Sequence, residues 1–219
     1  MVVSLQRGWT LANADLRTDL DMSASEIEKA RLAHSLLGAA RGAVVMAMFG
    51  AGWLGVGLGA AGAFNEATGP LFGFAEMALL GCSIELVRSG RAMGKKFPLP
   101  LEEQRPVLRA FLVLLAVEVG AILLASILAK RLGRPDLVAD WCALVVGLHF
   151  FPLARIFRTP QLAVLGALLT LWSVFCWALF HGNTLTSAVS VGTGALFGIR
   201  CVAALVRGWG IRRQITGYR

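Results

Sequence analysis

The most regular feature of this chain is a series of long apolar stretches separated by short polar segments. Each stretch is close to the roughly 20 residues that an α-helix needs to cross about 30 Å of hydrocarbon. Lipid cannot hydrogen-bond an exposed backbone, so stretches of this length and polarity predict transmembrane helices. Six such helices are predicted, over residues 42–64, 70–87, 107–129, 137–156, 161–180 and 184–206.

Proline positions support these boundaries. Because proline lacks a backbone N–H, it is favoured in the first turn of a helix, where that donor would have no partner. Proline stands at or just before four of the predicted starts, at Pro70, Pro106, Pro135 and Pro160. Pro152, in contrast, lies inside the fourth predicted span.

The composition agrees with a membrane setting. Hydrophobic residues make up 57% of the 219 residues and charged residues 16%, and the mean hydropathy is +0.69. A soluble domain is about 45–50% apolar and about 25% charged, so a globule of this size would leave much apolar surface in water. The predicted fold class is therefore all-α, a polytopic membrane bundle of six transmembrane helices.

The same pattern divides the chain into three parts. Residues 1–41 are predicted to form a cytoplasmic N-terminal extension with an amphipathic helix, residues 42–206 the six-span domain, and residues 207–219 a basic cytoplasmic tail. Cytoplasmic segments of membrane proteins carry an excess of lysine and arginine. Of the 21 lysines and arginines, only Lys130, Arg131 and Arg134 fall on the side opposite the N-terminus, so both ends are predicted to lie in the cytoplasm.

The net charge of +8 bears on the partners of the chain. A basic patch on one face is typical of nucleic-acid binding. Here the basic residues lie between apolar runs and at the C-terminus, so nucleic acid is not an expected partner. The expected partners are membrane lipids, with anionic head groups at the cytoplasmic face.

Ionisable side chains inside the predicted spans form the main candidate site, because a charge at the bilayer centre costs about 2.5–3.5 kcal/mol. At about 1.5 Å per residue, Glu118 lies roughly 16 Å from the inner start of its span, and His149 roughly 18 Å from the outer start of its own. Both are therefore near the midplane, where they can meet on neighbouring antiparallel helices. Pro152 predicts a kink or break beside them, and Glu76 is a further acid of this candidate ligand or proton site.

A structural interpretation of the Glu–His pair is equally open, since one interhelical hydrogen bond contributes about 0.5–2 kcal/mol to helix association. A second group of charges lies closer to the inner face and comprises Glu85, Arg200, Arg109 and Arg41. Glu85 with Arg200 is the predicted ion pair of this group, and an anion site is the alternative.

Small residues recur every four positions on the first and sixth spans. Faces of this kind let two helix backbones approach closely. They predict packing of the first helix on the sixth or on another neighbour, and a homo-oligomer interface is the alternative. The residues are Ala51, Gly55, Gly59 and Ala63 on the first span, and Thr186, Ser190, Gly194 and Gly198 on the sixth.

The sequence favours no enzyme class and predicts no cofactor. The four cysteines lie in apolar segments without C-x-x-C spacing, so a zinc or redox site is not expected. Cys142 and Cys176 come out at similar depth, which leaves a disulfide between them open. The histidines lie at different depths, so no metal site is predicted, and there is no H-E-x-x-H, G-x-S-x-G or P-loop motif.

One short segment resembles a known pattern. Gly147, His149, Phe150 and Pro152 fit a G-x-H-F-x-P motif that is found in small multi-span bacterial membrane proteins of unknown function. The resemblance implies a bacterial inner-membrane setting and supplies no activity. From the midplane Glu118 and His149 we expect a small transporter or channel-like protein with proton coupling. A non-catalytic membrane module that binds a protein partner or lipids through its small-residue faces is the alternative.

Overall fold

Six α-helices make up most of the part of the chain that this computed structural model describes, residues 24–96 and 105–217. Each predicted span corresponds to one of them. Residues 1–23, which include much of the predicted N-terminal extension, lie outside the described residues. The helices are α2 (Ala24–Ala60), α3 (Thr68–Lys96), α4 (Arg105–Arg131), α5 (Leu137–Ile156), α6 (Pro160–Leu179) and α7 (Gly182–Gly217).

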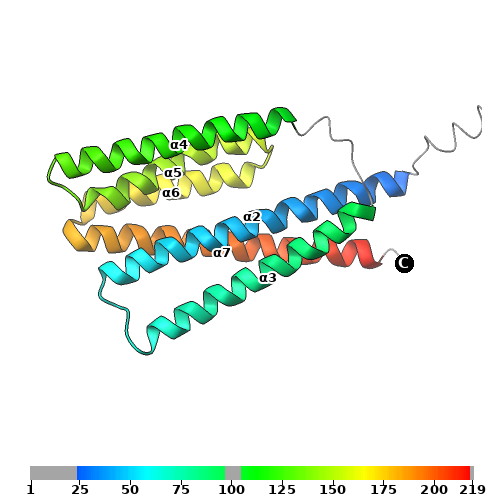
Figure 1. The fold of residues 1–219 in the computed structure, drawn as a ribbon, viewed down its shortest axis with the longest axis horizontal. Coiled ribbons are helices and arrows are strands. Elements are labelled where there is room, and N and C mark those ends of the chain that lie inside the picture. Colours follow the sequence, from blue (N-terminus) through cyan, green and yellow to red (C-terminus); the bar gives the residue numbers. More distant parts are fainter. Residues whose placement is uncertain (1–23, 97–104, 218–219) are drawn as a thin grey trace, which may run out of the picture.

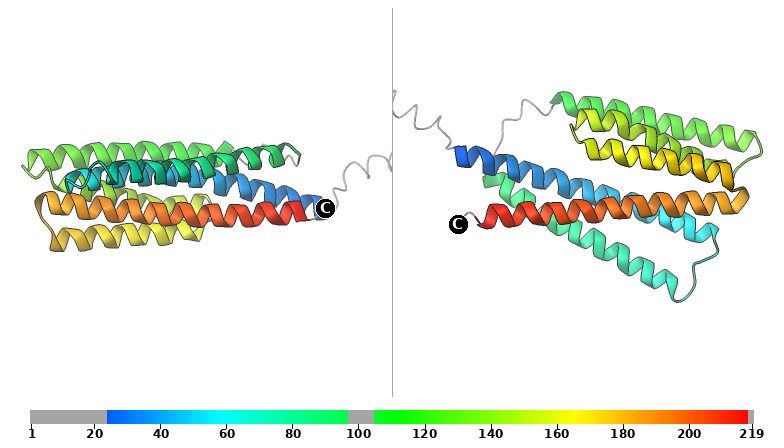
Figure 2. Two further views of the ribbon diagram at one scale, coloured as in Figure 1. Left: turned by 90° about the horizontal axis from the view of Figure 1, so that it is seen from below. Right: turned by 180° about the vertical axis from the view of Figure 1, so that it is seen from behind.

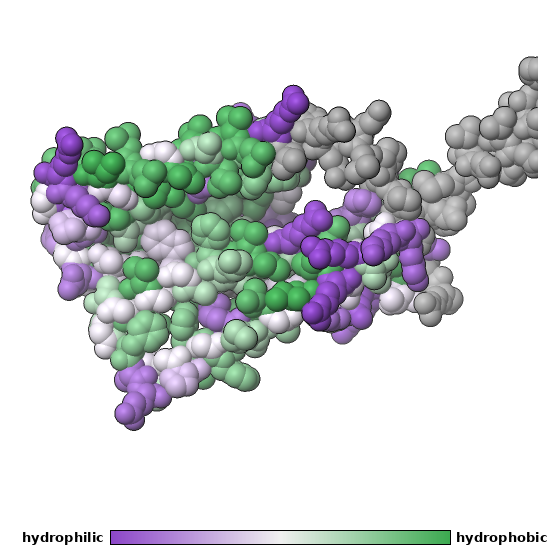
Figure 3. Space-filling view, viewed as in Figure 1, coloured by the Kyte–Doolittle hydropathy of each residue, from purple (hydrophilic) through white to green (hydrophobic). Residues whose placement is uncertain are grey.

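The outer surface of the bundle is apolar. Large side chains such as Phe74, Leu71 and Val206 have exposed fractions of 75%, 69% and 67%. Figure 3 shows a broad, mostly apolar region between two more polar ends. Each of the six described helices is long and apolar enough to cross a membrane. Such a surface is suited to lipid and would aggregate in water, so the chain is a multi-pass membrane protein.

The helices form two groups of three, one of α2, α3 and α7 and the other of α4, α5 and α6 (Figures 1 and 2). Among the described helices, α7 contacts all the others except α4, and α4 contacts only α5. The groups meet around Phe197 of α7, which is 1% exposed and lies with its ring centroid 6.0 Å from that of Phe150 on α5. The main apolar core therefore surrounds α7 and includes buried residues of α2, α3, α5 and α6.

Helix lengths define the two ends of the bundle. Helices α5 and α6 have 20 residues each, or about 30 Å, which matches the hydrocarbon thickness. Helices α2 and α7 have 37 and 36 residues and extend past them where the described chain both begins and ends (Figure 1). We call this the basic end, after Arg88, Arg91, Lys95, Lys96, Arg155, Arg158, Arg207, Arg212 and Arg213.

The first helix is longer than its predicted span. It begins at Ala24 and runs without interruption into the apolar stretch, so residues 24–41 are the first part of one long helix. The residues buried in this part, Ala30, Ala33, Leu36 and Ala40, are mostly small. Small side chains let α3 approach, and a Cβ added at Gly90 would lie 3.1 Å from the Cα of Leu37.

Helices α2 and α7 make backbone contact through glycine. A Cβ added at Gly194 would lie 2.8 Å from the backbone nitrogen of Leu54 and 3.0 Å from the carbonyl oxygen of Gly50. Gly57 is equally close to α7, because its Cβ would lie 2.7 Å from the backbone nitrogen of Val191. The close approach predicted for Gly194 is therefore made within one chain.

The predicted small-residue face of the first span is displaced from this contact. A Cβ at Gly55 would have nothing within 4 Å, and one at Gly59 would meet only the ring of Phe64 in the following loop. Gly198 lies at the edge of the contact, where its backbone nitrogen would be 3.5 Å from a Cβ at Gly50. The helix rotation that buries Gly50 and Gly57 turns Gly55 and Gly59 away from α7, so these two glycines do not line the predicted interface.

Candidate functional site

Helix α4 is held to the bundle by one stripe of side chains. Phe111, Leu114 and Ile122 are partly buried against the core, and Ala129 is fully buried. Their successive spacings of three, eight and seven residues place them on one face of a helix. Glu118 falls in the middle of this stripe and at the midpoint of α4, so it faces α5 and not the surrounding lipid.

Glu118 meets His149 from α5. The distance from Glu118 Oε2 to His149 Nε2 is 3.4 Å, and the two side chains are 11% and 8% exposed. At about 1.5 Å per residue, His149 lies about 18 Å from the start of α5. The structure thus brings together the two groups that depth alone placed near the midplane, and it shelters both between helices.

Pro152 lies one turn beyond His149 in α5. The sequence predicted a kink or break here, but α5 is not broken, because it runs from Leu137 to Ile156 with Pro152 inside it. Proline removes the backbone N–H that would bond the carbonyl four residues earlier, which is that of Leu148. A carbonyl without its helical donor therefore precedes His149, at the depth of the Glu–His pair.

Glu76 does not belong to this site. It lies on α3, and among the described helices α3 contacts only α2 and α7, whereas α4 contacts only α5. The sequence grouped Glu76 with the other two as a further acid within a span, but a position within a span does not specify which helices are neighbours. The separation of the two helix groups keeps Glu76 away from Glu118.

The predicted inner charge cluster is not formed. Glu85 is exposed, whereas its neighbours Ser83 and Leu86 are buried. Ser83 Oγ lies 3.9 Å from Cys201 Sγ on α7. Within residues 24–96 and 105–217 no ion pair joins Glu85 to Arg200. The rotation of α3 that buries Ser83 turns Glu85 outward, so the predicted pair is wrong.

Arg200 has a different partner. Its Nη2 donates to Gln161 Oε1 at 3.0 Å, and Arg207 Nη1 donates to the same oxygen at 3.2 Å. Arg41 on α2 and Arg109 on α4 are exposed, and α4 does not contact α2 or α7 in the described part of the chain. Gln161 was not among the predicted site residues, and its position in the first turn of α6 is its only signal in the sequence.

A second buried carboxyl was also missed. Asp140, in the first turn of α5, is 3% exposed. Ser173 Oγ on α6 lies 2.7 Å from Asp140 Oδ1 and 3.0 Å from the Asp140 carbonyl oxygen, and it donates to this acceptor pair. Nearby, Cys176 is fully buried and, like Cys142, is a free thiol, so the disulfide left open by the sequence is not formed.

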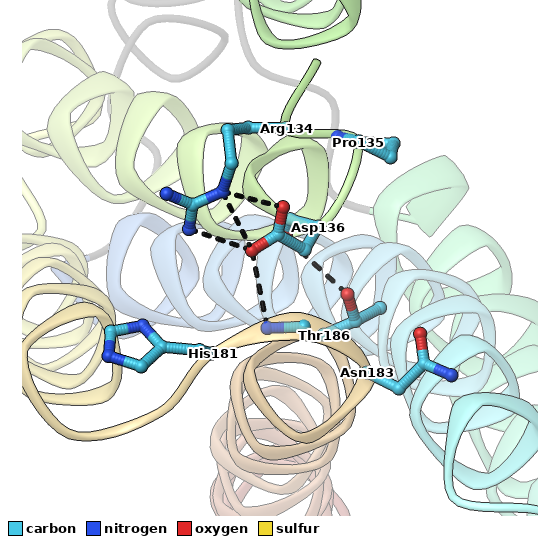
Figure 4. A pocket seen from close by; sticks show the side chains of 7 residues that line it. Arg134, Pro135, Asp136, His181, Asn183 and Thr186 are labelled. Carbon is cyan, nitrogen blue, oxygen red and sulfur yellow. Dashed lines mark hydrogen bonds and ion pairs between the residues drawn. The ribbon is translucent and has the colours of Figure 1, made fainter. Parts of the chain in front are cut away.

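A polar pocket lies at the end of the bundle opposite the basic end (Figure 4). Asp136, before α5, accepts hydrogen bonds from Arg134 Nη2 at 2.8 Å and from the backbone N–H of Gly182 at 3.3 Å. The bond from Arg134, followed by that from Gly182, lowers the pKa of Asp136 below its usual range. Gly182 has φ 59°, a left-handed conformation that glycine adopts without strain. Asp136 therefore ties the α4–α5 loop to the α6–α7 turn.

The Glu118–His149 arrangement suits proton binding. The pair is neutral overall whether the proton lies on the carboxyl or on the imidazole, so it can hold one proton without placing net charge in the membrane. Gain or loss of a further proton gives the pair a net charge, which a site at this depth accepts only with a compensating group or water.

No known relative supplies an activity for this arrangement. No protein-family model matches the sequence, no curated protein matches it, and no solved structure matches the fold. The function is therefore argued from the residues of the chain itself.

Proposed function

We propose that this chain is a small transporter or channel-like membrane protein in which Glu118 and His149 carry a proton through the middle of the bilayer. One observation carries the proposal. A carboxyl and an imidazole from two different helices lie 3.4 Å apart at mid-depth and face away from lipid. Ionisable groups in such positions are costly and mark ion or proton pathways in membrane proteins.

Polar groups on both sides of the pair support a route for the proton. Toward the Asp136 end lie the hydroxyl of Ser126 on α4 and the thiol of Cys142 on α5. Toward the basic end, Pro152 lines a surface pocket together with Arg155. In this proposal His149 exchanges protons with one side and Glu118 with the other. Transfer between them occurs when Nε2 and Oε2 close from 3.4 Å to hydrogen-bond distance.

The orientation is part of the proposal. The basic end faces the cytoplasm, because basic loops are retained on that side, and both ends of the chain lie there. The G-x-H-F-x-P motif favours a bacterial inner membrane as the location. A reporter enzyme fused after Arg219 tests this orientation: activity of a cytoplasm-specific reporter supports it, and activity of a periplasm-specific reporter contradicts it.

Proton flux into liposomes tests the function directly. The full-length protein is reconstituted with a pH-sensitive dye inside the vesicles, and a proton gradient is imposed. We expect flux above that of empty liposomes for the natural chain, and flux reduced to the empty-liposome level for Glu118→Gln. His149→Gln should have the same effect, because either substitution removes one proton carrier of the pair.

Glu76→Gln is the matched control, since it makes the same chemical change on a helix that does not contact α4 or α5. Flux through this variant should equal that of the natural chain. Equal flux in Glu118→Gln and the natural chain would remove the proposal, as would natural protein that conducts no more than empty liposomes.

A further inference from the structure

A second surface pocket lies at the basic end, beside the short turn between α5 and α6. Its apolar wall comprises Phe151, Pro152, Ala154 and Ala163, and its charged part comprises Arg155 and Arg158. Phe151 is 40% exposed, so an apolar surface is available next to two guanidinium groups. The pocket therefore has an apolar part that suits an acyl chain and a basic part that suits an anionic head group.

The two guanidinium groups are unpaired. Within the described residues, no carboxylate lies within 4 Å of Arg155 or Arg158 and neither side chain makes a hydrogen bond, and both residues are exposed. At the opposite end of the bundle, by contrast, Arg134 is paired with Asp136 at 2.8 Å. The charges at the α5–α6 turn are thus available to an anion from outside the chain.

The depth of the turn places these charges at the lipid head groups. Helices α5 and α6 span about 30 Å each, so the turn that joins them lies at the edge of the hydrocarbon. The hydrogen bonds of Arg200 and Arg207 with Gln161 show that these two arginines of α7 lie close to the same level. Beyond Arg207, α7 continues to Gly217 and extends out of the apolar layer.

The backbone of the turn gives an independent indication. Arg158 has φ 49°, and among the described residues it is the one non-glycine residue with positive φ. A non-glycine residue in this region is strained, because its Cβ comes too close to the following carbonyl oxygen, and a glycine would avoid this strain. Strained residues cluster at ligand-binding and active sites. Here the strain is associated with a charged side chain that has no partner within the described chain.

We propose that this pocket, defined by Arg155, Arg158, Phe151, Pro152 and Ala163, binds one anionic phospholipid. The phosphate lies between the two guanidinium groups, and one acyl chain lies against the apolar wall. Arginine is suited to phosphate because its planar fork presents several donors to the phosphate oxygens. Basic pockets between helices at the cytoplasmic side are a recurrent form of lipid recognition. This inference does not rest on proton transport.

Native mass spectrometry of the full-length protein in detergent tests the site. The protein is titrated with phosphatidylglycerol and, separately, with phosphatidylcholine. We expect one phosphatidylglycerol to be retained at concentrations where phosphatidylcholine is lost. In the double variant Arg155→Gln/Arg158→Gln its affinity should fall roughly tenfold or more, because each basic residue at the surface contributes about 1 kcal/mol to binding an anionic lipid.

Arg88→Gln/Arg91→Gln is the matched control, because it removes the same charge at the same end from two exposed residues of α3. It should retain the lipid with the affinity of the natural chain. An equal loss in both double variants would show general electrostatic attraction and overturn the site. Equal retention of the two lipids would also overturn it, as would displacement of phosphatidylglycerol by millimolar inorganic phosphate, which would identify a free-phosphate site.

Discussion

Gly147 of α5 and Gly166 of α6 lie directly against each other, so that a Cβ added at Gly166 would be 2.6 Å from the carbonyl oxygen of Gly147. A Cβ at Gly147 would in turn lie 3.0 Å from the backbone nitrogen of Thr170. Backbone atoms cannot move aside as a flexible side chain can. The crossing of α5 and α6 therefore requires glycine at both positions, and it holds the helix that carries His149.

Alanine at Gly166 should destabilise the protein. Overpacking of a tight contact costs about 1–3 kcal/mol, which exceeds the roughly 1 kcal/mol that alanine gains over glycine within a helix. We expect a lower midpoint of thermal unfolding in detergent. Gly120→Ala is the control, because a Cβ at that position of α4 would have nothing within 4 Å, and it should unfold no earlier than the natural chain. Equal midpoints for the two variants would contradict the crossing.

The contact between α2 and α7 predicts opposite effects at two glycines that are close in sequence. Gly57→Ala should lower the unfolding midpoint, since its Cβ would lie 2.7 Å from the backbone of Val191. Gly55→Ala should leave the midpoint unchanged or raise it, because there is open space around that position. If Gly55→Ala were the damaging change, the residues at the α2–α7 contact would be wrongly assigned.

Asp140 depends on Ser173 for its hydrogen bond. Ser173→Ala would leave a buried carboxyl without that donor, and an unsatisfied buried polar group costs about 1–3 kcal/mol. Replacing both partners, in Asp140→Ala/Ser173→Ala, should recover part of this loss because no polar group is left unpaired. Unfolding in detergent measures both effects. If the loss in the double variant equalled or exceeded the sum of the losses in Asp140→Ala and Ser173→Ala, that would argue against a direct interaction.

Acid should weaken the contact that Asp136 makes between the α4–α5 loop and the α6–α7 turn. The folded pKa of Asp136 is lowered from its ordinary 3.8, chiefly by the hydrogen bond from Arg134. Its stabilising contribution is therefore complete above 3.8 and is lost as the pH falls through the lower folded value. In Asp136→Asn the unfolding midpoint should be lower at neutral pH and should decline less in acid. Parallel acid profiles for the two proteins would show that this pair does not contribute.

The positions of the apolar spans and the depth of residues within them could be predicted from the sequence, because both follow from local properties. Apolar length specifies the spans, and a constant rise per residue placed Glu118 and His149 at similar depth. Neighbours and rotation depend on the packing of the whole bundle. Glu85 and Arg200 have similar depth but do not pair, because burial of Ser83 turns Glu85 outward. Asp140 was missed because its donor Ser173 lies 33 residues away in sequence and on another helix.

The same limit explains the glycine contacts. Gly55 and Gly59 form a regular four-residue pattern, but the contact with α7 is made by Gly50, Leu54 and Gly57. Several small-residue faces exist on α2, and its sequence alone does not select among them. The face that is used depends on where Gly194 of α7 lies.

The central claim is that Glu118 and His149 act as one proton-binding unit within the membrane. Infrared difference spectroscopy of the protein in lipid bilayers, titrated from about pH 5 to about pH 8 across the range in which histidine changes charge, measures this most directly. We predict a carboxyl C=O band that titrates in the natural chain, is absent in Glu118→Gln and is shifted in its midpoint by His149→Gln. A band that stays unchanged over the whole range, or that titrates identically without His149, would contradict the claim.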